Sequence, residues 1–91
     1  MRHELKCWPE YFQPIIDGLK RFEVRKDDRG FKKDDELFLR EYDITRDRYT
    51  GRHLLCTVMY VLRGESWALQ PDVCVMSIHT TSAYQPFGTE R

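Results

Sequence analysis

The stretch that decides the fold is GLKRFEVR, at residues 18 to 25. On its amino-terminal side, apolar residues recur at helical spacing at positions 11, 12, 15, 16 and 19, and Pro9 suits the first position of a helix. Gly18 can adopt the left-handed conformation that ends a helix. From Phe22 onward, apolar and polar side chains alternate as they do in a strand. The stretch therefore predicts a short helix followed closely by a strand.

Further strands are expected on both sides of this stretch. The segments with strand character are residues 3–8, 21–25, 36–42, 54–62 and 73–78. The run LLCTVMYVL at residues 54 to 62 is the longest apolar run and favours a strand buried on both faces. Because one helix and about five strands occur without β-α-β alternation, we expect an α+β fold. The strands should be mainly antiparallel and curl into a small barrel, with the helix packed beside it.

The length predicts a single domain. A chain of 91 residues supports one hydrophobic core, and 41% hydrophobic with 33% charged residues is typical of globular proteins. We expect this domain to span residues 1 to 80. Residues 81 to 91 are polar and contain proline, so they are expected to form a loosely ordered tail.

Several classes of protein are disfavoured by the sequence. No stretch approaches the roughly 20 apolar residues that a membrane span needs, and no apolar signal region follows Met1, so we expect a cytoplasmic protein without a membrane partner. Cys7, Cys56 and Cys74 form no close pair, and the three histidines are scattered. Buried thiols in a reducing compartment are therefore expected, with no metal site and no cofactor.

Charge is balanced overall but uneven along the chain. Fifteen basic and fifteen acidic residues cancel, which argues against tight nonspecific binding to a nucleic acid duplex. Residues 18 to 33 nevertheless contain seven basic and three acidic side chains. This segment is either a local basic patch or a solvated turn.

Lys20, Glu23 and Arg25 are the leading candidates for a binding site. The lysine follows the helix, and the glutamate and arginine lie two residues apart on one strand face, within about 7 Å of each other. Lysine and arginine bind phosphate or carbonyl groups, and a glutamate accepts hydrogen bonds from the amino groups of a base or orients the arginine. The alternative is a solvent-facing ion pair that adds little stability.

The pattern G-x-K-x-x-E-x-R, complete at Gly18, Lys20, Glu23 and Arg25, resembles the signature of ASCH domains (activating signal cointegrator homology). ASCH domains are similar in fold to PUA RNA-binding domains. Further blocks in the same order, from LKCWPEYF at residues 5–12 to VMSI at residues 75–78, look like small phage and bacterial ASCH-like proteins. The resemblance covers roughly residues 3 to 78. It implies a cleft between helix and barrel that recognises RNA or a nucleotide.

One ASCH branch suggests an alternative function, hydrolysis of a modified nucleoside. In these small amidohydrolases a lysine acts as base, a threonine as nucleophile, and a later glutamate assists. Lys20 matches the lysine, whereas Glu23 stands in the place of the threonine, and Glu65 lies in no matching motif. If the chain is an enzyme, Lys20 and Glu23 would be its catalytic residues. A protein-interaction module is a third hypothesis.

Other side chains are candidates for contact with a ligand: Trp8, Arg40, Tyr49, Arg52 and Trp67. Trp8 would stack on a base or belong to the core. Arg40 and Arg52 would contact phosphate or pair with Glu41 and Asp43 at the surface. Tyr49 would stack from a hairpin, and Trp67 lies in a loop expected to close over the cleft.

Overall fold

A computed structural model describes residues 1–64 and 69–85 of the chain. Its elements, in chain order, are β1 (Arg2–Cys7), α1 (Pro9–Ile16), β2 (Phe22–Lys26), β3 (Glu36–Asp43), β4 (Arg48–Arg63) and β5 (Val73–Tyr84). The strands form one sheet in the order β1-β3-β4-β5-β2. Only the β1–β3 pair within it is parallel.

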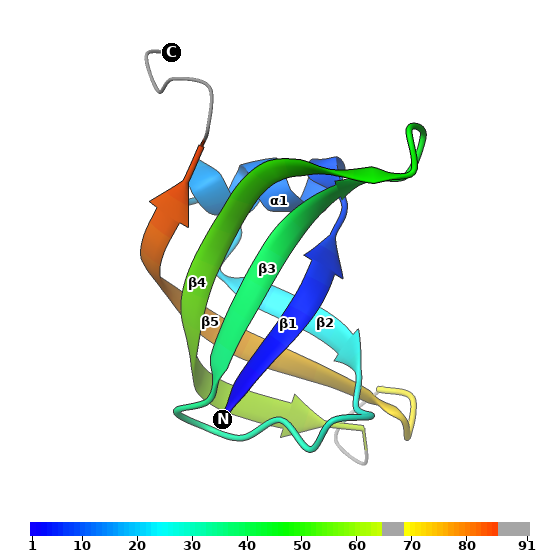
Figure 1. The fold of residues 1–91 in the computed structure, drawn as a ribbon. Coiled ribbons are helices and arrows are strands. Elements are labelled where there is room, and N and C mark those ends of the chain that lie inside the picture. The colour runs from blue at the N-terminus through cyan, green and yellow to red at the C-terminus, as the bar shows by residue number, and fades with distance from the viewer. Residues whose placement is uncertain (65–68, 86–91) are drawn as a thin grey trace.

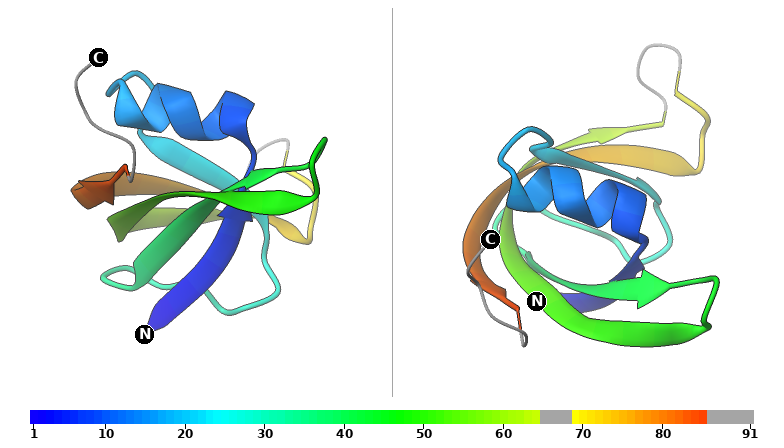
Figure 2. Two further views of the ribbon diagram at one scale, coloured as in Figure 1. Left: turned by 45° about the horizontal axis from the view of Figure 1, so that its top comes forward. Right: turned by 90° about the horizontal axis from the view of Figure 1, so that it is seen from above.

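The sheet curls strongly, and α1 lies across one end of it (Figures 1 and 2). In Figure 1, β1 and β3 lie in front of β2 and β5, because the sheet bends along the long strands β4 and β5. The predicted fold class, a curled and mainly antiparallel sheet with one short helix, is confirmed. Within the described residues, no helix has the length and apolar character needed to cross a membrane.

The helix is short and one-faced. Pro9 stands at its first turn, and Gly18 follows it with a φ of +76°, a conformation that glycine adopts without strain. Phe12 and Ile15 point into the sheet and are buried. They join a core contributed by α1, by every strand except β2, and by the loop before β3: Leu5, Cys7, Phe12, Ile15, Phe31, Leu37, Leu39, Leu54, Cys56, Val58, Cys74, Met76 and Ile78. The expected burial of the cysteines is confirmed for all three.

The two edge strands, β1 and β2, are linked by arginine side chains. Arg25 on β2 donates from Nη2 to the Lys6 carbonyl on β1 at 2.6 Å. Arg29, just after β2, donates from Nη1 to the Glu4 carbonyl at 3.0 Å. These bonds reach carbonyl groups on the edge of β1 that does not pair with β3. The curl of the sheet therefore brings its first and last strands into contact through side chains.

The predicted strand at residues 54–62 differs from β4 in two ways. β4 begins at Arg48, since residues 48 and 49 already pair with the end of β3, and the hairpin is confined to residues 44–47. Its side chains also alternate: Leu54 and Cys56 are fully buried, whereas Tyr60 is 63% exposed. Burial on both faces was therefore wrong, because no element in residues 1–64 and 69–85 covers the outside of the curled sheet here.

The expected boundary at residue 80 also needs correction. β5 continues to Tyr84, and its end pairs with β4, with Ala83 opposite Leu54. Residues 81–84 therefore belong to the sheet rather than to a loosely ordered tail. Residues 86–91 of the expected tail lie outside the described residues.

Candidate functional site

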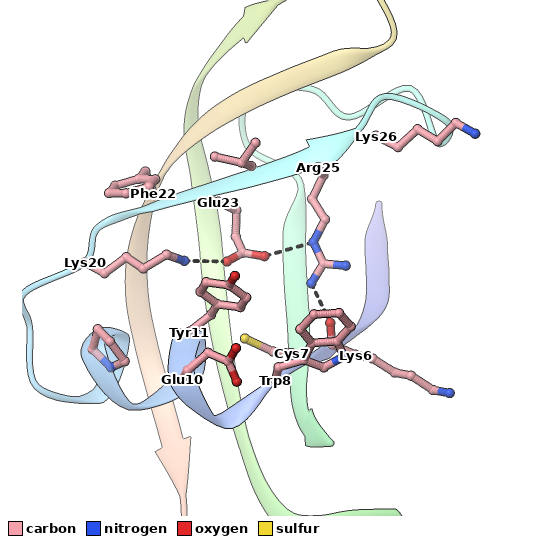
Figure 3. Close-up of a pocket in the computed structure, with 12 residues that line it drawn as sticks. Lys6, Cys7, Trp8, Glu10, Tyr11, Lys20, Phe22, Glu23, Arg25 and Lys26 are labelled. Atoms are coloured by element: carbon pink, nitrogen blue, oxygen red, sulfur yellow. Dashed lines mark hydrogen bonds and ion pairs between the residues drawn. The ribbon is translucent and has the colours of Figure 1, made fainter. Parts of the chain in front are cut away.

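Lys20, Glu23 and Arg25 form one connected group (Figure 3). Lys20 Nζ donates to Glu23 Oε1 at 2.9 Å, and Arg25 Nε donates to Glu23 Oε2 at 2.9 Å. Glu23 is only 3% exposed, so its charge is carried inside the protein between two cations. The expected placement of Glu23 and Arg25 side by side on β2 thus holds. The alternative, a fully solvent-facing ion pair, is wrong because the carboxylate is buried.

This group lies in a cavity of about 810 Å³ between α1, the end of β1 and β2. Three large aromatic side chains line it and stay accessible: Trp8 is 40% exposed, Tyr11 49% and Phe22 44%. The Trp8 and Tyr11 rings stack with centroids 6.2 Å apart. Trp8 is therefore at the cavity and not in the core. Exposed aromatic rings beside a buried charged group are typical of a binding site rather than of a packing surface.

The lining of the cavity carries an excess of positive charge. Among the described residues, its lining contains four basic side chains, Lys6, Lys20, Arg25 and Lys26, and two acidic ones, Glu10 and Glu23. Lys20 Nζ also lies 5.1 Å from the centroid of the Phe22 ring. An anionic ligand, or one that presents carbonyl groups, is favoured by this distribution.

Cys7 is the one thiol that lines the cavity among the described residues. Burial and the neighbouring charge of Glu23 raise the pKa of its thiol to about 12, although Lys20 and Arg25 act in the opposite direction. The thiol is therefore protonated at neutral pH, and a protonated thiol is a poor nucleophile and metal ligand. Within residues 1–64 and 69–85, no cluster of histidine, cysteine or acidic side chains has the arrangement to hold a metal ion.

Arg52 lies outside this cavity and is held by Glu41. Its Nε and Nη2 donate to the two carboxylate oxygens of Glu41, each at 2.8 Å, and Thr50 donates to the same carboxylate at 2.7 Å. The hydrogen bonds from Arg52 lower the pKa of Glu41, and the same hydrogen bonds to Glu41 raise the pKa of Arg52. Of the two expected roles, pairing with Glu41 is the observed one. The pair is mostly buried, beneath the Phe12 ring of α1, and not at the surface.

Arg40 and Tyr49 also lie away from the cavity. Arg40 donates to Glu4 at 2.9 Å, rather than pairing with Asp43, and its guanidinium carbon lies 3.7 Å from the centroid of the Tyr49 ring. Tyr49 therefore stacks on an arginine of its own hairpin. The expected contributions of Trp67 and Glu65 fall outside the described residues.

Comparison with known proteins places the chain in a family. Residues 2–78 match a family described as Domain of unknown function (DUF3850). The chain belongs to this family. A relative from Escherichia phage P2, described as "Uncharacterized 12.9 kDa protein in GpA 3'region", is 34% identical over 65 residues. The match covers 71% of this chain and spans 58% of the phage protein. This relative agrees with the predicted kinship to small phage proteins.

Sequence analysis of this DUF3850 domain missed several side chains at the cavity. Tyr11 and Phe22 were assigned only to the apolar patterns of the helix and strand, and Lys6 to a strand. A signal for Tyr11 was available, because it neighbours Phe12 and so points about 100° away from the buried face of α1. Phe22 had no comparable signal, since its exposure depends on its place at the start of an edge strand.

Proposed function

We propose that this DUF3850 domain is an ASCH-like, PUA-related module that binds RNA or a nucleotide in the cavity around Lys20, Glu23 and Arg25. The complete G-x-K-x-x-E-x-R pattern and the curled sheet with its helix across one end support the ASCH-like assignment. A cavity of about 810 Å³ is within the range of sites that enclose small ligands. The expected ligand is a nucleobase with its attached sugar and phosphate.

The observation that carries the proposal is the buried carboxylate of Glu23 between two cations. A carboxylate has about four lone-pair sites and an ammonium has three N–H donors. The two bonds to Glu23 therefore leave acceptor capacity on Glu23 and donor capacity on Lys20 for a ligand in the cavity. Glu23 accepts from a base amino group, while Lys20 and Arg25 donate to a carbonyl or phosphate oxygen. Their mutual bonds hold the group in place before the ligand arrives.

The aromatic side chains supply the second part of the recognition. Trp8 and Tyr11 present accessible rings beside the polar group. Stacking of a base on an aromatic ring contributes about 1–3 kcal/mol and tolerates any base. Single-stranded or free nucleotides expose their base faces, whereas bases in a duplex do not. The balanced total charge of the chain agrees with such a ligand better than with a duplex.

A hydrolase acting on a modified nucleoside is less well supported. Tyr11 provides the only hydroxyl group among the described residues that line the cavity, and the Cys7 thiol is protonated. Glu23 would also be a weak nucleophile, because its negative charge is already paired with two cations. Binding without turnover is therefore the favoured function.

An amide NMR titration of the isotopically labelled protein tests the proposal. The ligands are short single-stranded RNAs and a nucleoside panel that includes acetylcytidine, with product signals followed in the same tube. Saturable shifts around Lys20, Glu23 and Arg25 are expected, and Lys20→Ala should abolish them without unfolding the protein. Lys33→Ala, which removes an exposed lysine outside the cavity, serves as the control. Product would favour the hydrolase, and the absence of shifts with every ligand would favour a protein-binding module.

A further inference from the structure

A second cavity, of about 650 Å³, adjoins the first. It lies between the carboxyl end of α1 and strands β4 and β5, and Lys20 lines both cavities. Apolar side chains, among them Ile16, Leu54 and Ile78, form part of its wall. Arg21, whose side chain is exposed, also lines it.

The two cavities differ in charge. Two carboxylates line the first, whereas the described lining of the second contains Lys20 and Arg21 but no acidic side chain. Arg21 is held beside the end of α1, because its Nε donates to the Gly18 carbonyl at 3.2 Å. Lys20 uses one of its three N–H donors for Glu23. A phosphate is therefore accommodated at Lys20 on the side of Arg21, which leaves Arg25 to donate to a carbonyl group of the base in the first cavity.

We propose that a single-stranded nucleic acid binds across both cavities. One base occupies the first cavity, and the nucleotide next to it along the strand occupies the second. The phosphate that joins the two nucleotides lies at Lys20 and Arg21. The second base enters the apolar part of the cavity, against Ile16 and Ile78. This inference rests on the proposed function and narrows its ligand class to single-stranded oligonucleotides in place of free nucleotides.

Isothermal titration calorimetry with nucleoside monophosphates and with dinucleotides of the same bases tests this inference. The dinucleotide that contains the preferred base should bind about tenfold more tightly than its monophosphate, as expected when one more base is buried against an apolar surface. Ala83→Trp, which places a large side chain in the second cavity only, should remove this gain and leave binding of the monophosphate unchanged. Arg21→Ala should weaken the dinucleotide about tenfold, as expected for loss of a phosphate contact.

Arg48→Ala is the matched control, because Arg48 is an exposed arginine that lines neither cavity. It should bind dinucleotide like the unaltered protein. The monophosphate places its base in the first cavity and needs no base site in the second, so the absence of its binding would refute the proposed function itself. If the monophosphate binds but the dinucleotide gains less than about twofold, or if the gain survives Ala83→Trp, the second subsite is refuted.

Discussion

Glu23 is the side chain on which both the stability of the edge strand β2 and the candidate site depend. Its carboxylate is buried and neutralises Lys20 and Arg25 together. Glu23→Gln would leave these two cations close to each other without a counter-charge. We expect this variant to lose about 3 kcal/mol in free energy of unfolding, measured by urea denaturation.

Lys20→Ala provides the comparison for this experiment. It leaves Glu23 paired with Arg25, so the buried carboxylate keeps one cation. The loss should therefore be smaller, about 1 kcal/mol. A Glu23→Gln protein as stable as the unaltered one, or less affected than Lys20→Ala, would contradict this account of the group.

At the residue scale, sequence analysis predicted the Lys20, Glu23 and Arg25 group because its members are close in sequence and follow strand alternation. It could not assign Arg52, whose partner Glu41 lies across a hairpin with a register shift between residues 40 and 42. Nor could it decide whether Trp8 is buried. That outcome depends on where α1 leaves the sheet uncovered, which is a tertiary property.

The pairing of β3 with β4 near the helix depends on the Glu41–Arg52 ion pair. The pKa of Glu41 lies below its ordinary value of 4.5, chiefly because Arg52 donates hydrogen bonds to it. A carboxyl group with a lowered folded pKa stabilises the protein above its unfolded pKa and loses this contribution as pH falls through the folded value. The contribution of this pair should therefore be complete above pH 4.5 and should decline below it.

Urea denaturation of the unaltered protein and of Glu41→Gln, at steps between about pH 3 and pH 7, measures this dependence. At neutral pH the variant should be less stable by about 3 kcal/mol, because Arg52 loses its charged partner in a mostly buried place. The difference should shrink in acid. A difference that stays constant over the whole range would show that Glu41 does not titrate as described.

The lengths of the elements were harder to predict than their types. Residues 43 to 52 are polar and contain Gly51, so their composition indicated a hairpin connection, whereas residues 48 to 52 belong to β4. They extend β4 because Tyr49 pairs with Tyr42 and Arg48 with Asp43 on β3. Cross-strand pairing of this kind outweighs local composition. The end of β5 was missed for the same reason, since its polar residues 79 to 84 pair with β4.

At the scale of the whole molecule, the curl of the sheet brings β1 and β2 into contact. Composition and periodicity did not predict this contact. The hydrogen bonds from Arg25 and Arg29 join residues that are 19 and 25 positions apart in the sequence. The fold class itself was predictable, because it depends on the number and spacing of apolar segments. The side-chain contacts across the edges depend on how far the sheet curls.

Arg29→Ala tests this contact, since Arg29 lies outside the lining of the first cavity. Loss of the hydrogen bond to Glu4 should lower the free energy of unfolding by about 1 kcal/mol. Hydrogen exchange measured by NMR should become faster in β1 than in the central strand β4. Arg48→Ala is the control, and equal exchange in β1 of both variants would mean that the Arg29 contact does not hold the edges together.

The central claim is that a nucleobase stacks in the cavity beside Glu23. Intermolecular nuclear Overhauser effects, recorded on the protein with a bound single-stranded RNA, test it most directly. We predict cross-peaks between base protons and the ring protons of Trp8 and Tyr11, which disappear in Arg25→Ala. Saturable RNA binding with cross-peaks only to residues outside the cavity would contradict the claim.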